Sequence, residues 1–307
     1  MKKIILLLIM IFFSLLMIAC ASDPAEVLRT EVPYIDTGVD VETWALVPAG
    51  EFLKGQHEHP TTIGYDYEIM VTDVTNAQYA GYLNEALAKG EIKIEDNKVF
   101  GFYPGDEFHG HKHEKKIDAG FWLLIPLEEP GIHIRFQGEQ FTVDNGFENH
   151  PVVMVTWFGA KAYCDFYGWS LPTEEEWEKA ARGADNRAYP WGNDITSHQA
   201  NYLASHHELK EFFGGIHPIT TAVGFYNGYR YNGYQTEKNV SPYGLYDMAG
   251  NVWQWTENVY PNTHLRYMRG GSEANYEYNL RVWARNSAEP DYFGINVGFR
   301  CVRDVQK

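Results

Sequence analysis

The sequence has little positive charge, few cysteines and no long apolar run beyond its N-terminus. Of its 307 residues, 25 are Lys or Arg and 41 are Asp or Glu, so the formal net charge is −16. A protein that neutralises nucleic-acid phosphates needs a broad basic face, and we therefore expect no nucleic-acid partner. Adhesion to anionic lipid head groups is disfavoured for the same reason, and the surplus of acid mainly favours solubility.

The sequence also lacks the motifs of several common enzyme classes. It contains no G-x-S-x-G elbow, Walker loop, H-E-x-x-H helix or Rossmann fingerprint. Nucleophilic hydrolysis, nucleotide binding and zincin chemistry therefore have no support from a motif.

The one long apolar run lies at the N-terminus, where residues 1–20 read MKKIILLLIMIFFSLLMIAC. Two lysines precede a short apolar stretch, which is the layout of a secretory signal peptide. The small residue directly before Cys20 is typical of a bacterial lipoprotein signal, so we predict lipidation of Cys20. This places the protein in the cell envelope, lipid-anchored on the outer membrane and exposed at the surface. An uncleaved membrane anchor is the alternative.

Beyond the signal, residues 21–43 show little periodicity and are predicted to be a tether, whereas residues 44–307 form one domain. A capping box marks a helix from Thr75 to Gly90. A second helix is predicted to end at Gly168, and a third to run from the N-cap Thr173 to Gly183. No helix is predicted after Gly183. Two or three helices among many short strands and long ordered loops indicate an α+β fold.

Two further cysteines, Cys164 and Cys301, follow in the domain. In an exported protein a pair this far apart is a plausible disulfide, which we expect to stabilise the fold by about 4–5 kcal/mol in the chain-entropy model. Two buried free thiols are the alternative.

Four side chains suited to metal binding lie together in EFHGHKHE: Glu107, His109, His111 and His113. In an extended segment the three imidazoles fall on one face and could bind Zn²⁺ or Ni²⁺. A solvated loop with an incidental run of histidines is the interpretation that we favour. The isolated or paired histidines are predicted to be surface residues: His57, His59, His206, His207 and His217.

Eight motifs give the sequence a family resemblance. They are, in order, WALVPAGEFLKG, DVTNAQYAGYL, HPVVMVTWFGAKAYC, LPTEEEWEKAARG, YPWGN, SPYGLYDMAGNVWQW, RGGS and GFRC. Together they resemble the formylglycine-generating enzyme (sulfatase-modifying factor) family over residues 44–303. The resemblance implies an elaborated C-type lectin fold. It also implies that Cys164 and Cys301 pair as a disulfide, as they do in some family members.

The same resemblance identifies catalytic residues that this chain has lost. Family members carry two cysteines, three and eight residues after the serine of RGGS, that bind copper and activate oxygen. Here Ser272 is followed at those positions by Asn275 and Leu280. Neither supplies the thiolate that a Cu(I) site requires. The resemblance therefore implies a chain without copper-dependent oxidase chemistry and with no required cofactor.

The family's calcium sites are weakened as well. An Asn-Val-Trp-Glu run whose oxygens hold Ca²⁺ becomes Asn251-Val252-Trp253-Gln254 here. Gln keeps a carbonyl oxygen but removes a formal charge, which lowers the affinity. Asn201 matches a ligand of a second site whose acidic partner cannot be placed. The resemblance thus implies, at most, weak calcium binding by Asn201, Asn251 and Gln254.

Between RGGS and GFRC, residues 273–296 are rich in Tyr, Asn, Ser and acids. Tyr and Trp offer a large contact area with few torsions to immobilise, and Ser, Asn and Gly offer adaptable hydrogen bonds. We predict that this segment is a ligand-binding surface without catalytic residues. Its predicted contact residues are Glu273, Ala274, Asn275, Tyr276, Glu277, Tyr278, Trp283, Ser287, Ala288, Glu289, Asp291, Tyr292, Phe293 and Gly294. The predicted scaffold residues are Leu280, Arg281, Val282, Arg285 and Pro290.

A lectin-type fold with exchangeable residues in this stretch resembles the variable proteins of diversity-generating retroelements, a group that includes a treponemal surface lipoprotein. There, adenine-directed mutagenesis rewrites chosen codons, largely those of Asn. The composition of the segment fits such codons, although Glu273 and Glu277 fit less simply. The resulting hypothesis is a surface-displayed lipoprotein that binds an unidentified protein or surface ligand. An envelope enzyme with altered oxidative chemistry and a structural envelope lipoprotein are the alternatives.

Overall fold

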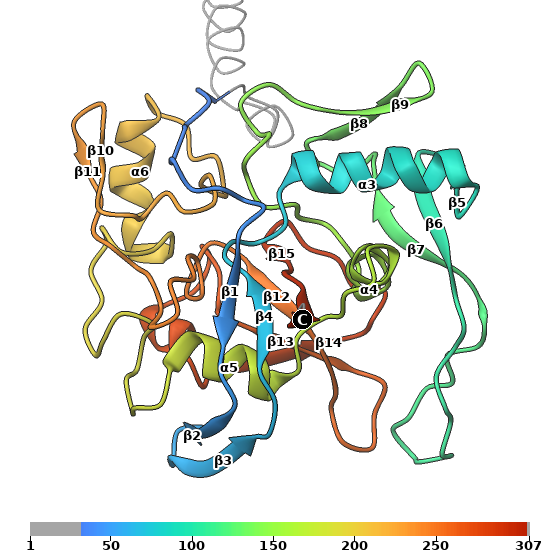
Figure 1. The fold of residues 1–307 in the computed structure, drawn as a ribbon. Coiled ribbons are helices and arrows are strands. Elements are labelled where there is room, and N and C mark those ends of the chain that lie inside the picture. Colours follow the sequence, from blue (N-terminus) through green and yellow to red (C-terminus); the bar gives the residue numbers. More distant parts are fainter. Residues whose placement is uncertain (1–31, 306–307) are drawn as a thin grey trace, which may run out of the picture.

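The computed structural model describes residues 32–305 (Figure 1). The predicted signal peptide and Cys20 lie outside these residues. Within them, no helix combines the length and the apolar character needed to cross a bilayer. Residues 32–43, predicted as part of a tether, pack on the domain instead: Val32 and Ile35 are buried, and Thr37 donates a hydrogen bond to the Val223 carbonyl at 3.0 Å. The folded unit therefore begins before residue 44.

The helices and 3₁₀ turns of the described residues are α3 (Asn76–Lys89), α4 (Trp157–Phe166), α5 (Glu174–Arg182), η1 (Leu203–Ser205), α6 (His206–Phe212) and η2 (Glu277–Leu280). The strands of the first half are β1 (Trp44–Val47), β2 (Gly50–Lys54), β3 (His59–Ile63), β4 (Tyr67–Met70), β5 (Ile92–Glu95), β6 (Lys98–Tyr103), β7 (Gly120–Pro126), β8 (Ile134–Gln137) and β9 (Gln140–Val143). Those of the second half are β10 (Arg230–Tyr231), β11 (Tyr234–Gln235), β12 (Trp253–Val259), β13 (Arg266–Arg269), β14 (Arg285–Ala288), β15 (Val297–Gly298) and β16 (Val302–Asp304).

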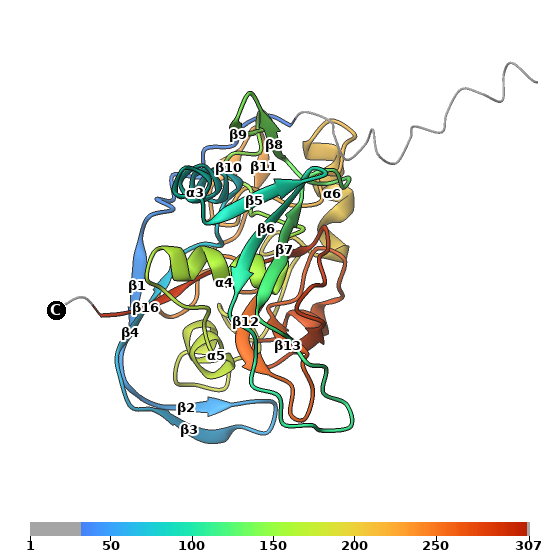
Figure 2. The ribbon, with the colours of Figure 1, turned by 90° about the vertical axis from the view of Figure 1, so that its right-hand side faces the viewer.

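Short sheets surround the helices. One has the order β1-β4-β16, a second β5-β6-β7 and a third β14-β13-β12-β15, and β2-β3, β8-β9 and β10-β11 are two-stranded. All pairs are antiparallel except β12 with β15. Figure 2 shows β1, β4 and β16 on one side of the molecule and the C-terminal segment around β13 on the opposite side. The observed mixture of helices and short strands confirms the predicted α+β fold.

The three predicted helices are present. Thr75 and Thr173 close capping boxes at the N-termini of α3 and α5, and Gly90 and Gly183 follow their last residues. The second predicted helix is α4, which ends at Phe166, two residues before Gly168. The prediction of no helix after Gly183 was wrong because α6 is present. Only Leu209 of this seven-residue helix is fully buried and no side chain caps its N-terminus, so tertiary packing rather than local sequence supports it.

The main core lies between α3, α4 and the four-stranded sheet. Tyr79 of α3 stacks on Tyr163 of α4 with ring centroids 5.8 Å apart, and Tyr82 meets the same ring edge-on at 5.4 Å. The next residue of α4, Cys164, is bonded to Cys301, which directly precedes β16. The predicted disulfide is therefore confirmed, and it joins α4 to the C-terminal strand.

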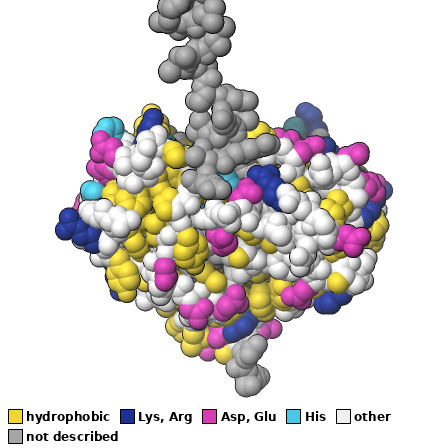
Figure 3. All heavy atoms as spheres, turned by 90° about the horizontal axis from the view of Figure 1, so that it is seen from above, with side chains coloured by type: hydrophobic (Ala, Val, Ile, Leu, Met, Phe, Trp, Pro, Cys, Tyr) yellow, Lys and Arg dark blue, Asp and Glu magenta, His cyan; other side chains and the backbone are white. Residues whose placement is uncertain are grey.

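Large apolar side chains are exposed at several places outside the C-terminal segment. Tyr34, Tyr65, Phe102, Phe121 and Tyr229 each leave about half or more of their surface in solvent. In Figure 3 hydrophobic, acidic and basic side chains are interspersed, and the visible part of that face has no continuous basic area. Exposure of an aromatic ring is thus not by itself a mark of a site in this protein.

Candidate functional site

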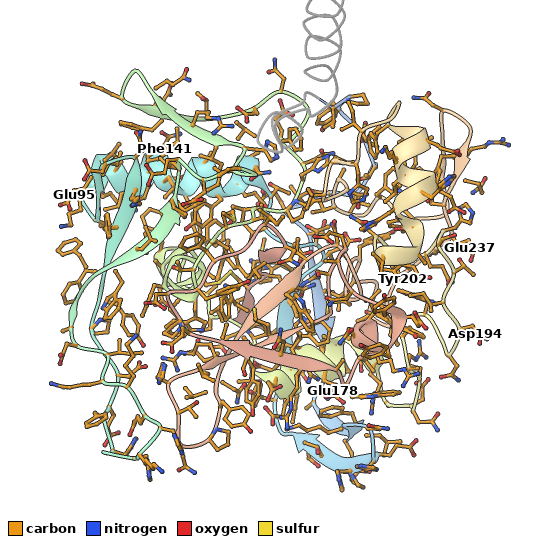
Figure 4. All side chains as sticks on the ribbon, turned by 180° about the vertical axis from the view of Figure 1, so that it is seen from behind. Glu95, Phe141, Glu178, Asp194, Tyr202 and Glu237 are labelled. Carbon is orange, nitrogen blue, oxygen red and sulfur yellow. A yellow bond between two sulfur atoms is a disulfide. The ribbon has the colours of Figure 1, made fainter. Side chains whose placement is uncertain are left out.

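The segment 273–296 starts after β13 and ends at β15, so the four-stranded sheet holds both of its ends. Inside it, β14 pairs antiparallel with β13, from Arg266 opposite Ala288 to Arg269 opposite Arg285. The short helix η2 lies on the same side of the molecule as Tyr202 and Asp194 in the view from behind (Figure 4). A hydrogen bond from the Leu203 N–H to the Asn275 carbonyl, at 3.1 Å, ties the two regions together.

Arg269, the arginine of RGGS, anchors the start of the segment to α5. Its guanidinium lies 5.4 Å from the ring of Trp177 and makes ion pairs with Glu174 and Glu178. It also donates to the Val282 carbonyl at 3.0 Å, inside the segment. Arg269 is almost fully buried. Its planar guanidinium donates to several acceptors at once, and no other side chain has this geometry.

Arg300, the arginine of GFRC, anchors the other end. It is fully buried and donates to Asp73 at 3.0 Å, to the Gln254 side-chain oxygen at 2.8 Å and to the Tyr246 carbonyl at 2.8 Å. Burial raises the pKa of Asp73 to about 7, although the guanidinium favours the carboxylate. The arginines at the two ends of the segment are therefore structural anchors rather than reactive groups.

Asn275 closes the first turn of the segment. Its side-chain oxygen accepts hydrogen bonds from the N–H and the hydroxyl of Ser272, both at 2.9 Å. The Ser272 hydroxyl in turn accepts a hydrogen bond from the Asn296 side chain at 3.1 Å. Leu280 is fully buried in a cluster with Tyr189 and Tyr202. Both residues that stand where the family resemblance places copper-binding cysteines thus have a packing role here.

Two tyrosines project from the start of η2, where Tyr276 is the N-cap and Tyr278 lies in the first turn. Tyr276 and Tyr278 are 57% and 56% exposed, and their rings lie nearly parallel, at 11°, with centroids 6.2 Å apart. Glu277 lies exposed between them, while its carbonyl accepts a hydrogen bond from the Tyr189 hydroxyl at 3.1 Å. The backbone is thus fixed and the side chains are free, which is the arrangement that we expected of contact residues.

The second arm of the segment, residues 287–294, has a mixed character. Asp291 and Tyr292 are exposed, whereas Ser287 and Gly294 are half-buried. Glu289 lies 2.7 Å from His264 Nε2 and 3.3 Å from Lys115 Nζ, and both distances join its Oε2. The remaining two, Ala288 and Phe293, are half-buried against the main core. Only part of the arm is therefore available to a partner.

Glu273 is a correction to the predicted surface, because its side chain is buried. Its N–H donates to the Asn251 carbonyl at 3.0 Å, and its own carbonyl accepts from His206 Nε2 at 2.8 Å. A carbonyl only accepts, so His206 Nε2 carries the hydrogen. Burial raises the pKa of the Glu273 carboxyl to about 7, and burial lowers the pKa of neighbouring His217 to about 4.

Trp283 is also less available than predicted. Its half-buried ring packs in the cluster around Trp177, with the guanidinium of Arg182 at 5.1 Å and that of Arg281 at 5.8 Å. The exposed contact residues are thus Ala274, Tyr276, Glu277, Tyr278, Asp291 and Tyr292. Of the predicted scaffold residues, Leu280, Val282 and Pro290 are buried, Arg281 is half-buried and Arg285 is exposed.

The three residues considered for calcium do not form one oxygen-lined site. Asn201 and Asn251 do meet, with the Asn201 amide nitrogen 3.3 Å from the Asn251 side-chain oxygen. Gln254, however, uses its side-chain oxygen to accept hydrogen bonds from Trp177 at 2.7 Å and from Arg300 at 2.8 Å. A cation next to the Arg300 guanidinium would be repelled, so Gln254 does not fit the ion, and calcium binding by Asn201 and Asn251 stays a prediction.

The histidine run lies in the long loop between β6 and β7. Glu114 accepts hydrogen bonds from the N–H groups of His109 and His111, at 3.0 Å and 3.2 Å, and so shapes the loop. Within residues 32–305 no group of three or more His, Cys, Asp or Glu side chains could hold a metal ion. The favoured interpretation, a solvated loop, agrees with the exposure of His109, His111 and His113.

Several residues near the surface carry no signal in the sequence. Leu203 and His206 contact the first arm, and His264 and Lys115 contact the second. His57, His59 and His207 are exposed as predicted, whereas His206 and His217 are half-buried. Leu203 and His206 come from η1 and α6, and Lys115 and His264 come from loops, so parts of the chain distant in the sequence bring these residues to the segment. No spacing rule reports such contacts.

The sequence matches a model of a protein family over residues 32–305, described as "Sulfatase-modifying factor enzyme 1-like domain". The inactive C-alpha-formylglycine-generating enzyme 2 of Bos taurus is 30% identical over 256 residues, which cover 76% of each chain. The formylglycine-generating enzyme of Mus musculus is 31% identical over 261 residues, which cover 76% of this chain and 64% of the mouse enzyme. The chain thus spans less than two thirds of the mouse protein.

Two solved structures superpose on this chain, and the first of them shares its fold. PvdO from Pseudomonas aeruginosa superposes with a TM-score of 0.55 at 20% identity, covering 85% of this chain and 94% of PvdO. Treponema denticola variable protein 1 superposes with a TM-score of 0.49 at 18% identity, covering 86% of this chain and 97% of the other. The family model and the curated relatives confirm the predicted family resemblance.

Proposed function

The chain belongs to the family of the sulfatase-modifying factor enzyme 1-like domain, and from this premise we propose that it is a lipid-anchored, surface-displayed binding protein. In this proposal the exposed residues of the segment 273–296 contact the ligand, and the family's oxidation is absent. The single observation that carries it is the pair of replacements at Asn275 and Leu280. One closes a turn with Ser272 and the other fills an apolar cluster.

The shape of the segment supports a binding role. Arg269 and Arg300 fix its two ends, and hydrogen bonds from Tyr189 and Ser272 fix its first turn. Binding to a fixed surface loses little conformational entropy, which favours affinity. The exposed side chains on this support include three tyrosines, the residue type most suited to adaptable recognition.

The position of the segment is compatible with an anchor at the N-terminus. In Figure 1 the described chain enters at the top, beside α6 and the β8–β9 hairpin, whereas β13 and β14 lie in the lower half. A lipid on Cys20 would therefore leave the segment accessible. Replacing Cys20 with Ala should abolish incorporation of radiolabelled palmitate and release the protein from membranes; retention of both would refute the anchor.

Ligand binding is tested with the full mature chain on arrays of peptides and glycans. The variant combines Tyr276→Ala, Tyr278→Ala and Tyr292→Ala, and the matched control combines Tyr65→Ala, Phe102→Ala and Phe121→Ala, which remove exposed rings elsewhere. Specific signals should disappear with the first variant and survive in the control. Signals that survive in both, or copper-dependent oxidation of a cysteine peptide by the wild type, would overturn the proposal.

The diversification of the segment is tested in the neighbouring DNA. A near-copy of the coding region for residues 273–296, with adenines where this gene differs, beside a reverse transcriptase gene would support it. If no such copy exists near the gene, the segment is an ordinary binding surface and the diversification is rejected.

One observation favours the alternative of an enzyme with altered chemistry. Glu273 is a buried carboxyl with a pKa raised to about 7, and its Oε2 lies 4.0 Å from His206 Nε2. A perturbed carboxyl beside an imidazole is suited to proton transfer. Oxidation of an added substrate by the wild type but not by Glu273→Gln would establish this activity. The absence of turnover in the wild type leaves binding as the function.

A further inference from the structure

The parallel rings of Tyr276 and Tyr278 can form a clamp for a planar group once they move apart. A planar group stacked between two aromatic rings needs about 7 Å between the ring planes, because carbon atoms in contact lie about 3.5 Å apart. The ring centroids of Tyr276 and Tyr278 are 6.2 Å apart and their planes differ by 11°. Since more than half of each side chain is exposed, a small side-chain rotation opens the pair to that width.

The charge at the clamp is negative. Of the four acids in the segment, Glu273 is buried and Glu289 is paired with His264 and Lys115. The other two, Glu277 and Asp291, are exposed and make no ion pair with any of residues 32–305. Glu277, which lies between the two tyrosines in the sequence, therefore has a carboxylate that is free to bind a cation.

The nearby cations are already engaged. Arg285 pairs with Glu174 at 3.4 Å and lies 4.9 Å from the ring of Tyr267. Arg281 lies 5.8 Å from the ring of Trp283. Burial first, and then the charge of Glu277, raises the pKa of Tyr202 beneath the clamp. Both nearby arginines thus have other partners, and the Glu277 carboxylate has no cation paired with it.

We propose that Tyr276, Glu277 and Tyr278 together bind an arginine side chain of the partner, a step that rests on the ligand-binding function proposed above. A guanidinium is planar, so it stacks between two rings while its N–H groups reach a carboxylate. A lysine ammonium is compact and strongly hydrated and uses only the carboxylate. The partner of this surface is thus a protein or peptide with an exposed arginine.

The rigid backbone under the clamp strengthens this assignment. The Glu277 carbonyl is held by the Tyr189 hydroxyl, the Asn275 carbonyl by the Leu203 N–H and the Tyr276 carbonyl by the Asn279 N–H, at 3.0–3.1 Å. The entropy lost on binding is therefore confined to a few side-chain torsions. Because the backbone of three successive residues is held in this way, the surface can discriminate by shape between a planar guanidinium and a compact ammonium.

The test uses three small probes and the full mature chain with ¹³C-labelled tyrosine rings. The probes are N-acetyl-arginine amide, N-acetyl-lysine amide and N-acetyl-citrulline amide, which is planar but uncharged. With the arginine probe the ring resonances of Tyr276 and Tyr278 should shift, with a Kd on the order of millimolar. The lysine probe should bind about fivefold more weakly, and citrulline should cause no shift. The ring of Tyr229, which is exposed outside the segment, serves as an internal control and should not respond.

Variants assign the effect to the clamp. Tyr276→Leu and Tyr278→Leu should each weaken arginine binding about fivefold, and Glu277→Gln about tenfold. Glu51→Gln, which removes an exposed carboxyl outside the segment, in β2, is the matched control and should leave the Kd unchanged. Equal binding of lysine and arginine, or wild-type affinity of Glu277→Gln, would overturn the clamp. The array signals described above test the binding function independently, because loss of the clamp leaves Tyr292 and Asp291 to contact a ligand.

Discussion

The side-chain oxygen of Asn275 accepts hydrogen bonds from both the N–H and the hydroxyl of Ser272, each at 2.9 Å. The hydroxyl is also bonded to Asn296, near the far end of the segment. Asn275 thereby connects the two arms through Ser272. At the position where the resemblance places a copper ligand, this chain has an amide side chain that connects the two arms of the segment through hydrogen bonds.

Replacing Asn275 with Ala should lower the free energy of unfolding by about 2 kcal/mol, because two partly buried donors lose their acceptor. Amide hydrogen exchange of residues 272–280 should accelerate at the same time. Urea unfolding and exchange by mass spectrometry measure the two effects. Asn286→Ala, in exposed β14 of the same segment, is the control and should change stability by less than about 0.5 kcal/mol. Equal stability of both variants would contradict the connecting role.

Much of the fold follows from local signals. Thr75 and Thr173 supply both caps and capping boxes, so the sequence predicts α3 and α5 almost to the residue. The helix α6 could not be predicted in this way, because its support comes from Phe225 and Tyr226, which lie beyond it in the sequence and adjoin it in three dimensions. Residues 32–43 were misassigned for the same reason: Val32 and Ile35 find their burial in distant loops, not in a periodic pattern.

The disulfide between Cys164 and Cys301 should provide a large share of the stability. It closes a loop between residues 137 positions apart, which the chain-entropy model values at about 4–5 kcal/mol. The double variant Cys164→Ala, Cys301→Ala should unfold at a correspondingly lower urea concentration. A reducing agent should shift the wild-type midpoint toward that of the variant and leave the variant unchanged. An unshifted wild type under full reduction, verified by thiol counting, would contradict the assignment.

Of the last two arginines in the chain, Arg300 should contribute more to the free energy of unfolding than Arg303. Replacing it with Met leaves the buried Asp73 without its partner, and breaking a buried pair in this way costs about 3–5 kcal/mol. Arg303→Met is the matched control, since Arg303 is partly exposed and pairs with Glu68; its cost should stay below about 1 kcal/mol. Adding Asp73→Asn to Arg300→Met should recover part of the loss in urea unfolding, because the unpaired charge disappears. Similar costs for the two arginine variants would refute this ranking.

The candidate surface was only partly predictable, because composition does not report burial. Tyr276 and Glu273 stand three residues apart in a segment of uniform character, yet one is exposed and the other is buried. The difference arises from His206 of α6, which lies against the Glu273 carbonyl. No local signal in the sequence predicts this helix. Trp283 is likewise of a residue type that is common in contact surfaces, but its ring packs against the core as a scaffold residue does.

The burial of Glu273 gives the stability a distinct pH dependence. Its pKa is about 7 in the folded chain and near its ordinary value of 4.5 in the unfolded chain. The folded state thus binds the Glu273 proton more tightly than the unfolded state does. The resulting contribution to the free energy of unfolding is complete below about pH 4.5 and is lost as the pH rises through 7. His217 acts in the opposite sense, because burial lowers its pKa to about 4 and stability falls as the pH drops below about 6.5.

Comparison with Glu273→Gln isolates the first effect, since both proteins retain His217. Between pH 5 and 7 the wild type should lose on the order of 2 kcal/mol relative to the variant. Urea unfolding at a series of pH values measures this difference. Glu277→Gln removes an exposed carboxyl four residues away and should follow the wild type at every pH. A difference between the wild type and Glu273→Gln that stays constant from pH 5 to 7 would show that the carboxyl ionises at its ordinary pKa.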